Sequence, residues 1–389
     1  MSATGAVSGT GAVRGPGAKP RVAVVHGTLR VPPTYFTLEQ ALPLRDRFEI
    51  EFHALATQIA EPLPLPVHDA LGLHRLPFRR REFLLPLVLG RLSRELRRSG
   101  PDLLHQQFGT WSSPARHAAA ALRAPLLATL HGSDVFTTSY AGRDPRYAWH
   151  RRNVLGVLHE ADRVLCVSRF LADAAVSAGA DPGRVEVHHQ GVDTDFLTPG
   201  EGPDAAAGAG PPRVLFVGRL AAYKGVPDLV EASLDLARRG VEHELVLVGD
   251  GPLRPHLEEQ SRSHPHLTVA GPRDREGVRD ALRGGHVLVL PSTPREAAGL
   301  VLLEAQACGV PVVAYASGGK PEMLEPDRTG SLVPHGDVTA LADAVAGILG
   351  LDPAEHAAMA ARAREFVVTQ RSLPVSAAAL GEHYEALLG

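Results

Sequence analysis

The chain has 389 residues, a formal net charge of −3 and 44% hydrophobic residues. This length allows two α/β domains, and this charge gives no general case for nucleic-acid binding. The two cysteines, Cys166 and Cys308, lie in apolar segments, so no disulfide framework is indicated and a reducing compartment is expected. The 19 histidines form no HExxH motif and no Cys/His cluster, and no metal site is predicted.

The ends of the chain and its hydropathy predict a cytoplasmic location. Residues 1–20, rich in Gly, Ala and Ser, lack an apolar signal core and are expected to form a disordered tail. No apolar run is long enough to cross a bilayer. The protein is therefore expected to be cytoplasmic, or peripheral at the inner face of the membrane.

Apolar runs bounded by turn residues predict the strands of an N-terminal domain over residues 21–197. The predicted strands are 21–26, 101–108, 124–130, 163–168 and 185–188. A loop is expected from Gly27 through Thr34, facing an interdomain cleft. Ser168 is expected to cap a helix that begins at Arg169.

The segment 73–100 carries eight arginines and two glutamates among Leu, Phe and Val. Two interpretations stay open. A basic amphipathic segment of this kind binds anionic lipid and would bring an enzyme to a lipid-linked acceptor. The alternative is a solvated helix face whose apolar side packs on the sheet.

The composition of residues 198–212 is typical of a linker, and a second domain is predicted over 213–373. Its predicted strands are 213–217, 245–248, 267–270, 286–290, 310–315 and 330–333. Helices over 353–370 and 376–388 are expected to pack outside the sheet. Two Rossmann-like, doubly wound domains facing a central cleft are therefore the predicted fold class.

The second domain contains one strand, loop, helix and strand unit that predicts a binding site. The helix is expected to run from Gly299 to near Cys308, with Gly309 in the left-handed conformation that ends helices. The N–H groups of Gly299, Leu300 and Val301 point out of the helix N-terminus, which is a natural phosphate site. Glu296 precedes this site and Glu304 lies beside it, so the two carboxylates are placed to accept hydrogen bonds from hydroxyls on either side of a diphosphate.

A second group of residues points to the same chemistry. Gly218 ends the strand 213–217 and is followed by Arg219 and Lys224 near a helix start. Backbone N–H groups, a helix dipole and two cations together predict a diphosphate clamp. The alternative for the two cations is solvation in an ordinary loop.

The Glu296-x7-Glu304 spacing, followed by AQACGVPVVA and SGGKPE, resembles the signature of retaining GT-B glycosyltransferases of the family 4 type (glycosyl transferases group 1). The likeness extends over roughly residues 21–385. It departs at Ala297 and Ala298, where the family usually has Gly and an aromatic residue or Leu.

The resemblance implies roles for single residues. His131 of the HGSD motif would face the donor sugar across the cleft, and Asp134 would orient that loop or the histidine. Glu304 would hold the ribose, Glu296 the transferred sugar, and Pro272 would border the nucleotide base.

The resemblance also implies the wider architecture and the metal requirement. The helix 374–389 would cross back to the first domain. Asp193-Thr194-Asp195 imitates a metal-binding DxD motif but resembles the family's structural Gly-Val-Asp turn, and no metal or other cofactor is expected.

The expected activity is transfer of a sugar from a nucleotide-diphospho-sugar, UDP or GDP before others, to a hydroxyl acceptor. The acceptor would be a polysaccharide, a lipid-linked glycan or a small secondary metabolite. Two alternatives stay open: a sugar phosphorylase on the same fold, and a non-catalytic nucleotide-sugar-binding protein.

Overall fold

A computed structural model describes residues 17–31, 35–60, 63–73, 76–77, 80–81, 83–139, 145–200 and 210–389 of the chain. Parts of four predicted segments lie outside the described residues: 1–16 of the tail, 32–34 of the first loop, 74–75, 78–79 and 82 of the segment 73–100, and 201–209 of the linker.

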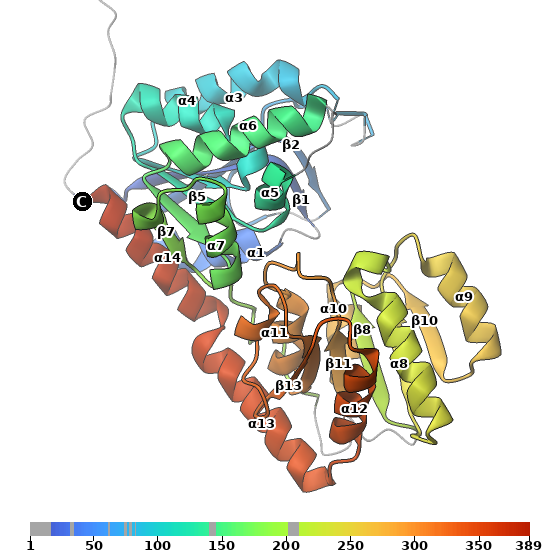
Figure 1. The fold of residues 1–389 in the computed structure, drawn as a ribbon. Coiled ribbons are helices and arrows are strands. Elements are labelled where there is room, and N and C mark those ends of the chain that lie inside the picture. Colours follow the sequence, from blue (N-terminus) through green and yellow to red (C-terminus); the bar gives the residue numbers. More distant parts are fainter. Residues whose placement is uncertain are drawn as a thin grey trace, which may run out of the picture.

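The N-terminal half forms a seven-stranded, wholly parallel sheet with strand order β3-β2-β1-β4-β5-β6-β7 (Figure 1). Its strands are β1 (Arg21–Val31), β2 (Glu49–Ile59), β3 (Val67–Asp69), β4 (Leu103–Gln107), β5 (Leu126–Leu130), β6 (Arg163–Cys166) and β7 (Val185–Val187). Its helices are α1 (Tyr35–Ala41), α3 (Leu85–Ser99), α4 (Ser113–Leu122), α5 (Ser133–Phe136), α6 (Pro145–Glu160) and α7 (Arg169–Ser177).

Both faces of this sheet are covered, so its central strands β4 and β5 are buried along their whole length. One face carries Leu55 and packs with Leu92 and Leu96 of α3. The other face carries Phe52 and packs with Tyr384, which comes from the C-terminal end of the chain. The strand β5 shows the result most clearly, because all five of its residues are buried.

The prediction for the first strand was wrong in its end point. Strand β1 continues through Gly27 to Val31, and β2 was not predicted at all. The pairing of β1 with β2 runs from Arg21 opposite Glu49 to Val31 opposite Ile59, so the long partner strand extends β1. Position 27 within the strand requires glycine, because a Cβ there would lie 2.2 Å from Cδ1 of Trp111.

The C-terminal half forms a six-stranded parallel sheet with strand order β10-β9-β8-β11-β12-β13. Its strands are β8 (Arg213–Val217), β9 (Glu244–Val248), β10 (Leu267–Gly271), β11 (Val287–Leu290), β12 (Val312–Tyr315) and β13 (Gly330–Val333). Its helices are α8 (Val226–Arg238), α9 (Arg254–Ser263), α10 (Arg275–Arg283), α11 (Leu300–Ala307) and α12 (Val338–Leu349). The predicted fold class, two doubly wound parallel-sheet domains, is confirmed.

Two long helices, α13 (Pro353–Gln370) and α14 (Leu373–Leu388), run along one side of both domains (Figure 1). Ala377, Leu380 and Tyr384 of α14 share a core cluster with Leu38 of α1. The hydroxyl of Tyr384 also meets Nδ1 of His105 on β4 at 2.7 Å. The last helix therefore belongs to the N-terminal core. Within the described part of the chain, no helix is both long and apolar enough to span a bilayer.

Candidate functional site

The site lies where strand order reverses in the C-terminal sheet. Strands β8 and β11 are hydrogen-bonded neighbours, but the chain leaves β8 toward β9 and leaves β11 toward β12. Loops after two such strands diverge and leave a crevice at their carboxyl ends. Lys224 follows β8 and Glu296 follows β11, so the topology brings these two predicted residues together.

Lys224 and Glu296 form a direct ion pair. The ammonium Nζ lies 2.6 Å from Oε2 of Glu296, and both side chains are mostly shielded from solvent. The turn that carries Lys224 is pressed against the end of β11, because a Cβ on Gly225 would lie 1.9 Å from the carbonyl oxygen of Pro291. Gly225 has a φ of 71°, which favours glycine. The backbone of this turn therefore fixes the position of the cation.

The N-terminus of α11 leaves donors available beside this pair. Gly299 caps the helix with a φ of 88° and no side-chain cap. Among the described residues, the N–H groups of Gly299, Leu300 and Val301 have no acceptor. Arg219 is exposed, and its guanidinium has no hydrogen bond or ion pair to a described residue. An anion would find free N–H donors, a helix dipole and two cations here.

Glu304 lies in the second turn of α11, as predicted, in an acidic and poorly solvated environment. Burial and the nearby Glu39 together raise the pKa of this carboxyl to about 7, against the opposing effect of Arg275. Glu39 comes from α1 of the other domain, so Glu304 faces the cleft. A carboxyl that is half protonated near neutral pH accepts hydroxyl hydrogen bonds best after it ionises.

Arg275, at the start of α10, links the two halves of the chain. Its guanidinium contacts the carboxylate of Glu39 and lies 3.1 Å from Oδ2 of Asp193. It also lies over the ring of Phe196, with Cζ 4.2 Å from the ring centroid, and 5.3 Å from that of Tyr35. This arginine holds the cleft edge beside Glu304. Local sequence patterns do not predict this role, because the partners of Arg275 are far away along the chain.

The alanines that depart from the family pattern are buried packing residues. A Cβ on Gly132, whose φ is 111°, would lie 2.6 Å from Cβ of Ala297. The hydroxyl of Ser168 donates to the carbonyl oxygen of Ala297 across 2.5 Å. The HGSD turn of the N-terminal domain thus touches the Glu296 loop of the C-terminal domain.

His131 lies in that turn, between two glutamine side chains. Its Nε2 is 2.7 Å from Oε1 of Gln107, so this nitrogen donates, and Nδ1 faces the amide of Gln190 at 3.4 Å. Burial lowers the pKa of His131 to about 3, and His26 and His188 lower it further. The imidazole is neutral at physiological pH, and the two glutamines fix its tautomer.

Asp134 is fully buried, and its carboxylate accepts hydrogen bonds from the backbone of its own turn and of the segment after β4. The donors are the N–H groups of Gly109, Gly132 and Val135 at 2.9 to 3.0 Å. Burial nevertheless raises its pKa, because the desolvation of the carboxylate outweighs these hydrogen bonds. Its contacts agree with the predicted orientation of the loop and leave no oxygen facing the cleft.

The SGGKPE segment holds the backbone at the exit of β11 in place. Lys320 is completely buried, and its ammonium donates to the carbonyl oxygen of Ser292 at 2.7 Å and to that of Thr293 at 3.3 Å. Burial lowers the pKa of Lys320 to about 8. The N–H of Gly319 donates to the carbonyl oxygen of Glu296 at 2.9 Å. This lysine therefore holds the exit of β11, on which Glu296 depends.

Glu322, also in this segment, contacts the other domain. Its carboxylate accepts from the N–H of Arg169 at 2.9 Å and from Nε2 of His189 at 2.8 Å. Burial alone would raise the pKa of Glu322, but these hydrogen bonds hold it below its usual value. The carboxylate occupies the N-terminus of α7, where the helix dipole favours a negative charge.

The remaining predicted residues occupy loops at the same edge of the sheet. Pro272 is exposed directly after β10, and Gly218 directly follows β8.

Asp193, in the N-terminal domain, lies in a structural turn. Its side chain accepts backbone hydrogen bonds from Asp195 and Phe196 at 3.1 and 3.0 Å.

Each half of the chain matches a separate glycosyltransferase family model. Residues 47–196 match the model described as Glycosyltransferase Family 4, and residues 211–350 match the model described as Glycosyl transferases group 1.

The chain is similar to curated bacterial proteins. A D-inositol 3-phosphate glycosyltransferase from Mycobacteroides abscessus is 35% identical over 253 residues, which cover 61% of this chain and 54% of that protein. A putative colanic acid biosynthesis glycosyltransferase, WcaL of Escherichia coli, is 29% identical over 77% of this chain and 73% of its own length. The similarity thus spans little more than half the length of the mycobacterial relative.

Solved structures share the whole fold. A sucrose-phosphate synthase from Thermosynechococcus elongatus superposes with a TM-score of 0.77 at 25% identity, covering 95% of this chain and 99% of that one. HepE of Anabaena, in complex with UDP-glucose, superposes with a TM-score of 0.76 at 20% identity, covering 94% and 99%. With both halves matched and the GT-B fold shared, the chain is a member of the group 1, family 4 glycosyltransferases.

Proposed function

We propose that the protein transfers a sugar from a nucleotide-diphospho-sugar to a hydroxyl acceptor, with retention of the anomeric configuration and without a metal ion. The observation that carries this proposal is the Lys224–Glu296 ion pair beside the uncapped N-terminus of α11. It combines a cation and free N–H groups for a diphosphate with a carboxylate for the adjoining sugar.

The leaving diphosphate is stabilised by groups already in place. Arg219 and Lys224 supply positive charge, and the N–H groups of Leu300 and Val301 supply hydrogen bonds. Preorganised stabilisation of developing charge is commonly the largest contribution to rate. Two cations and a helix dipole perform the charge neutralisation for which other enzymes use a divalent ion, so the proposed reaction needs none.

The carboxylates orient the donor. Glu304 accepts hydrogen bonds from the ribose hydroxyls, and Glu296 accepts them from hydroxyls of the transferred sugar. The neutral His131 faces the sugar from the other domain, and its Nδ1 exchanges the long 3.4 Å contact with Gln190 for a sugar hydroxyl. Retention follows from attack of the acceptor on the same face that the diphosphate leaves, with a phosphate oxygen taking the acceptor proton. Contact between the domains excludes water and so limits hydrolysis.

UDP is the nucleotide we propose first, because HepE, which shares the fold, is described in complex with UDP-glucose. The relatives' names, an inositol phosphate glycosyltransferase and a colanic acid glycosyltransferase, support a polyol or glycan hydroxyl as the acceptor.

We also propose that α3 rests on an anionic membrane surface. Phe83 and Leu87 are 77% and 78% exposed, and Arg91, Arg94 and Arg98 continue the exposed side of the helix. Apolar side chains beside a row of cations suit a lipid–water interface. Flotation with phosphatidylglycerol vesicles should recover the wild type and lose the Phe83→Ser/Leu87→Ser variant. Equal flotation of both would refute this contact.

A thermal-shift screen against UDP, GDP, ADP and inorganic phosphate, run with EDTA, tests the donor site. A nucleoside diphosphate far above its Kd should raise the melting temperature, since ligands that bind only the folded state stabilise it. The shift should vanish in Arg219→Ala/Lys224→Ala and persist in Arg262→Ala, a surface control on α9. A shift with phosphate alone would favour a sugar phosphorylase. A nucleotide shift without turnover would favour a binding protein.

A further inference from the structure

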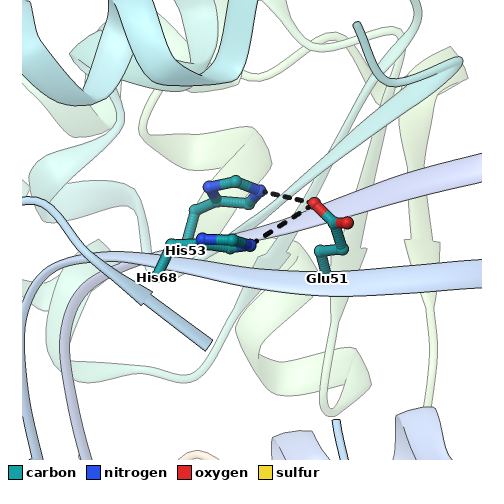
Figure 2. A group of neighbouring side chains, drawn as sticks. All are labelled: Glu51, His53 and His68. Atoms are coloured by element: carbon teal, nitrogen blue, oxygen red, sulfur yellow. Dashed lines mark ion pairs between the residues drawn. The ribbon is translucent and has the colours of Figure 1, made fainter. Parts of the chain in front are cut away.

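Three side chains with metal-ligating atoms lie together at the edge of the N-terminal sheet, far from the donor site in sequence (Figure 2). Glu51 and His53 are two residues apart on β2 and therefore point to the same face. His68 of β3 is the register partner of His53, which places its side chain on that face too. Within the described part of the chain this is the only such group of three.

The spacing of the three groups is that of metal ligands. Nε2 of His53 and Nε2 of His68 each lie 3.5 Å from the same oxygen, Oε2 of Glu51. This exceeds a normal N–H···O hydrogen bond of about 2.9 Å. Two atoms bound tetrahedrally to one ion at about 2.0–2.1 Å are themselves about 3.3–3.4 Å apart. The two distances to Glu51 are thus close to ligand spacing, and all the ligand atoms lie within 4.8 Å of one another.

His53 has a free ring although it is buried. Only 3% of the residue is exposed, and neither Nδ1 nor Nε2 has a hydrogen-bond partner among the residues that the structure describes. A buried polar group without a partner is unusual and calls for an explanation.

The exposed His68 gives solvent access to the cluster, and its ring is able to change orientation. Its side chain is 49% exposed, so solvent reaches the cluster from the side of β3. The two imidazoles are stacked, with ring centroids 4.6 Å apart and planes inclined by 17°. A shared ion lies in the plane of each ring, so binding requires the exposed His68 ring to turn while His53 stays in place. Figure 2 shows both rings beside the Glu51 carboxylate.

The cluster lies away from the cleft. Glu51 and His53 belong to the first half of β2, and the cleft adjoins the carboxyl ends of the parallel strands. The face they occupy is the one that packs with α3, because Leu55, two residues further along β2, shares a core cluster with Leu92 and Leu96. A bound ion would join β2 to β3, an edge strand of only three residues.

We propose that Glu51, His53 and His68 bind one Zn²⁺ ion, with water as the fourth ligand, and that this ion fastens β3 to the sheet. Two imidazoles and one carboxylate suit Zn²⁺, whereas Mg²⁺ and Ca²⁺ prefer oxygen ligands. The spacing of these residues matches no sequence motif, because the ligands come from two strands, so the prediction of no metal site from motifs did not address them.

Zinc binding to the full chain, stripped with EDTA and dialysed, tests this inference. Competition with a chromophoric chelator should give one Zn²⁺ per chain, and Zn²⁺ but not Mg²⁺ should raise the melting temperature. Co²⁺ should give the visible absorption of a four-coordinate site. His68→Ala, at an exposed edge position, should bind Zn²⁺ at least tenfold more weakly. It should keep its far-UV spectrum and its nucleotide-induced thermal shift.

His256→Ala, an exposed histidine on α9, is the matched control and should bind like the wild type. The inference is overturned if the wild type takes up no Zn²⁺, if His68→Ala binds as tightly as the wild type, or if His256→Ala loses as much affinity. Because the nucleotide-induced shift is measured separately, failure of the zinc site leaves the donor site unaffected.

Discussion

Lys224 and Glu296 form an ion pair, 2.6 Å from Nζ to Oε2. A diphosphate that enters the site competes with this carboxylate for the ammonium. Replacing either partner should therefore affect binding and turnover differently. In Lys224→Ala the affinity for a nucleoside diphosphate should fall about 10- to 100-fold, the loss expected for one charge-assisted hydrogen bond.

In Glu296→Gln the ammonium is freed, so the affinity for the nucleoside diphosphate should stay equal or rise. Turnover of the nucleotide-sugar should fall at least 100-fold, because the sugar loses its carboxylate. Isothermal titration measures the first quantity and nucleotide release the second. A Glu296→Gln variant that binds the diphosphate as weakly as Lys224→Ala would show that the carboxylate only positions the lysine.

Nucleotide affinity should rise with pH through about 7. The folded-state pKa of Glu304 is raised to about 7 by burial, so the carboxyl is mostly protonated at pH 6 and ionised at pH 8. Ribose hydroxyls donate best to the ionised form. Titrations at pH 6, 7 and 8 should show this rise, and Glu304→Gln should remove it, leaving only the pH dependence of the phosphate. An equal pH dependence in both proteins would contradict the role of Glu304.

The same shift predicts how Glu304 affects stability. A carboxyl with a raised folded-state pKa stabilises the folded state. Its contribution to the free energy of unfolding is present in full at pH values below the unfolded pKa of about 4.5. That contribution is lost as the pH rises through about 7. The free energy of unfolding of the wild type should therefore fall relative to that of Glu304→Gln between pH 5 and 8, as measured by urea denaturation. A difference that stays constant over this range would refute the shift.

Arg275→Ala should open the cleft and weaken donor binding. The variant loses the contacts with Glu39 and Asp193 that join the two domains. It also removes the cation that opposes the rise in the Glu304 pKa, so the pH midpoint of nucleotide binding should move upward. Small-angle scattering should report a larger radius of gyration.

Arg279→Ala is the control for Arg275→Ala. Arg279 also lies over Phe196, 4.8 Å from the ring centroid, but its ion pair is with the neighbouring Asp280. It should leave the radius of gyration and the pH midpoint unchanged. Equal effects of the two variants would show that stacking on Phe196 holds the cleft edge and that the contact with Glu39 does not.

Gly132→Ala should separate the two domains. The added Cβ would approach Cβ of Ala297 to 2.6 Å, at a backbone φ of 111°. Turnover should fall at least tenfold, and adding Ala297→Gly should restore part of it. Gly240→Ala, at a φ of 77° with open space around it, controls for backbone strain and should keep full turnover. If Ala297→Gly restores no turnover, the loss in Gly132→Ala comes from backbone strain alone.

Local patterns predicted most of the C-terminal domain. Gly309 adopts a φ of 75° after α11, and the six strands predicted for this domain all form. These features depend on neighbouring residues, which the sequence displays directly. Strand β2 escaped prediction because its charged and polar residues interrupt the apolar pattern, and its pairing with β1 is set by the tertiary fold.

Contacts between distant segments were not predictable in the same way. The segment SGGKPE entered the sequence analysis only as part of the family signature, whereas the ammonium of its Lys320 is buried against the exit of β11. The glutamines that hold His131 and the Arg275–Glu39 contact leave no mark in local spacing. The Glu296–Lys224 pairing was foreseeable in outline, because both residues follow strands that end at the same edge of a parallel sheet.

Donor turnover tests the central claim most directly. The wild type should release a nucleoside diphosphate from one member of a nucleotide-sugar panel in the presence of EDTA and a hydroxyl acceptor. NMR of the product should show the anomeric configuration of the donor, and Arg219→Ala/Lys224→Ala should reduce the rate at least 100-fold. Release that depends on a divalent ion, proceeds with inversion, or continues undiminished in the double variant would contradict the account.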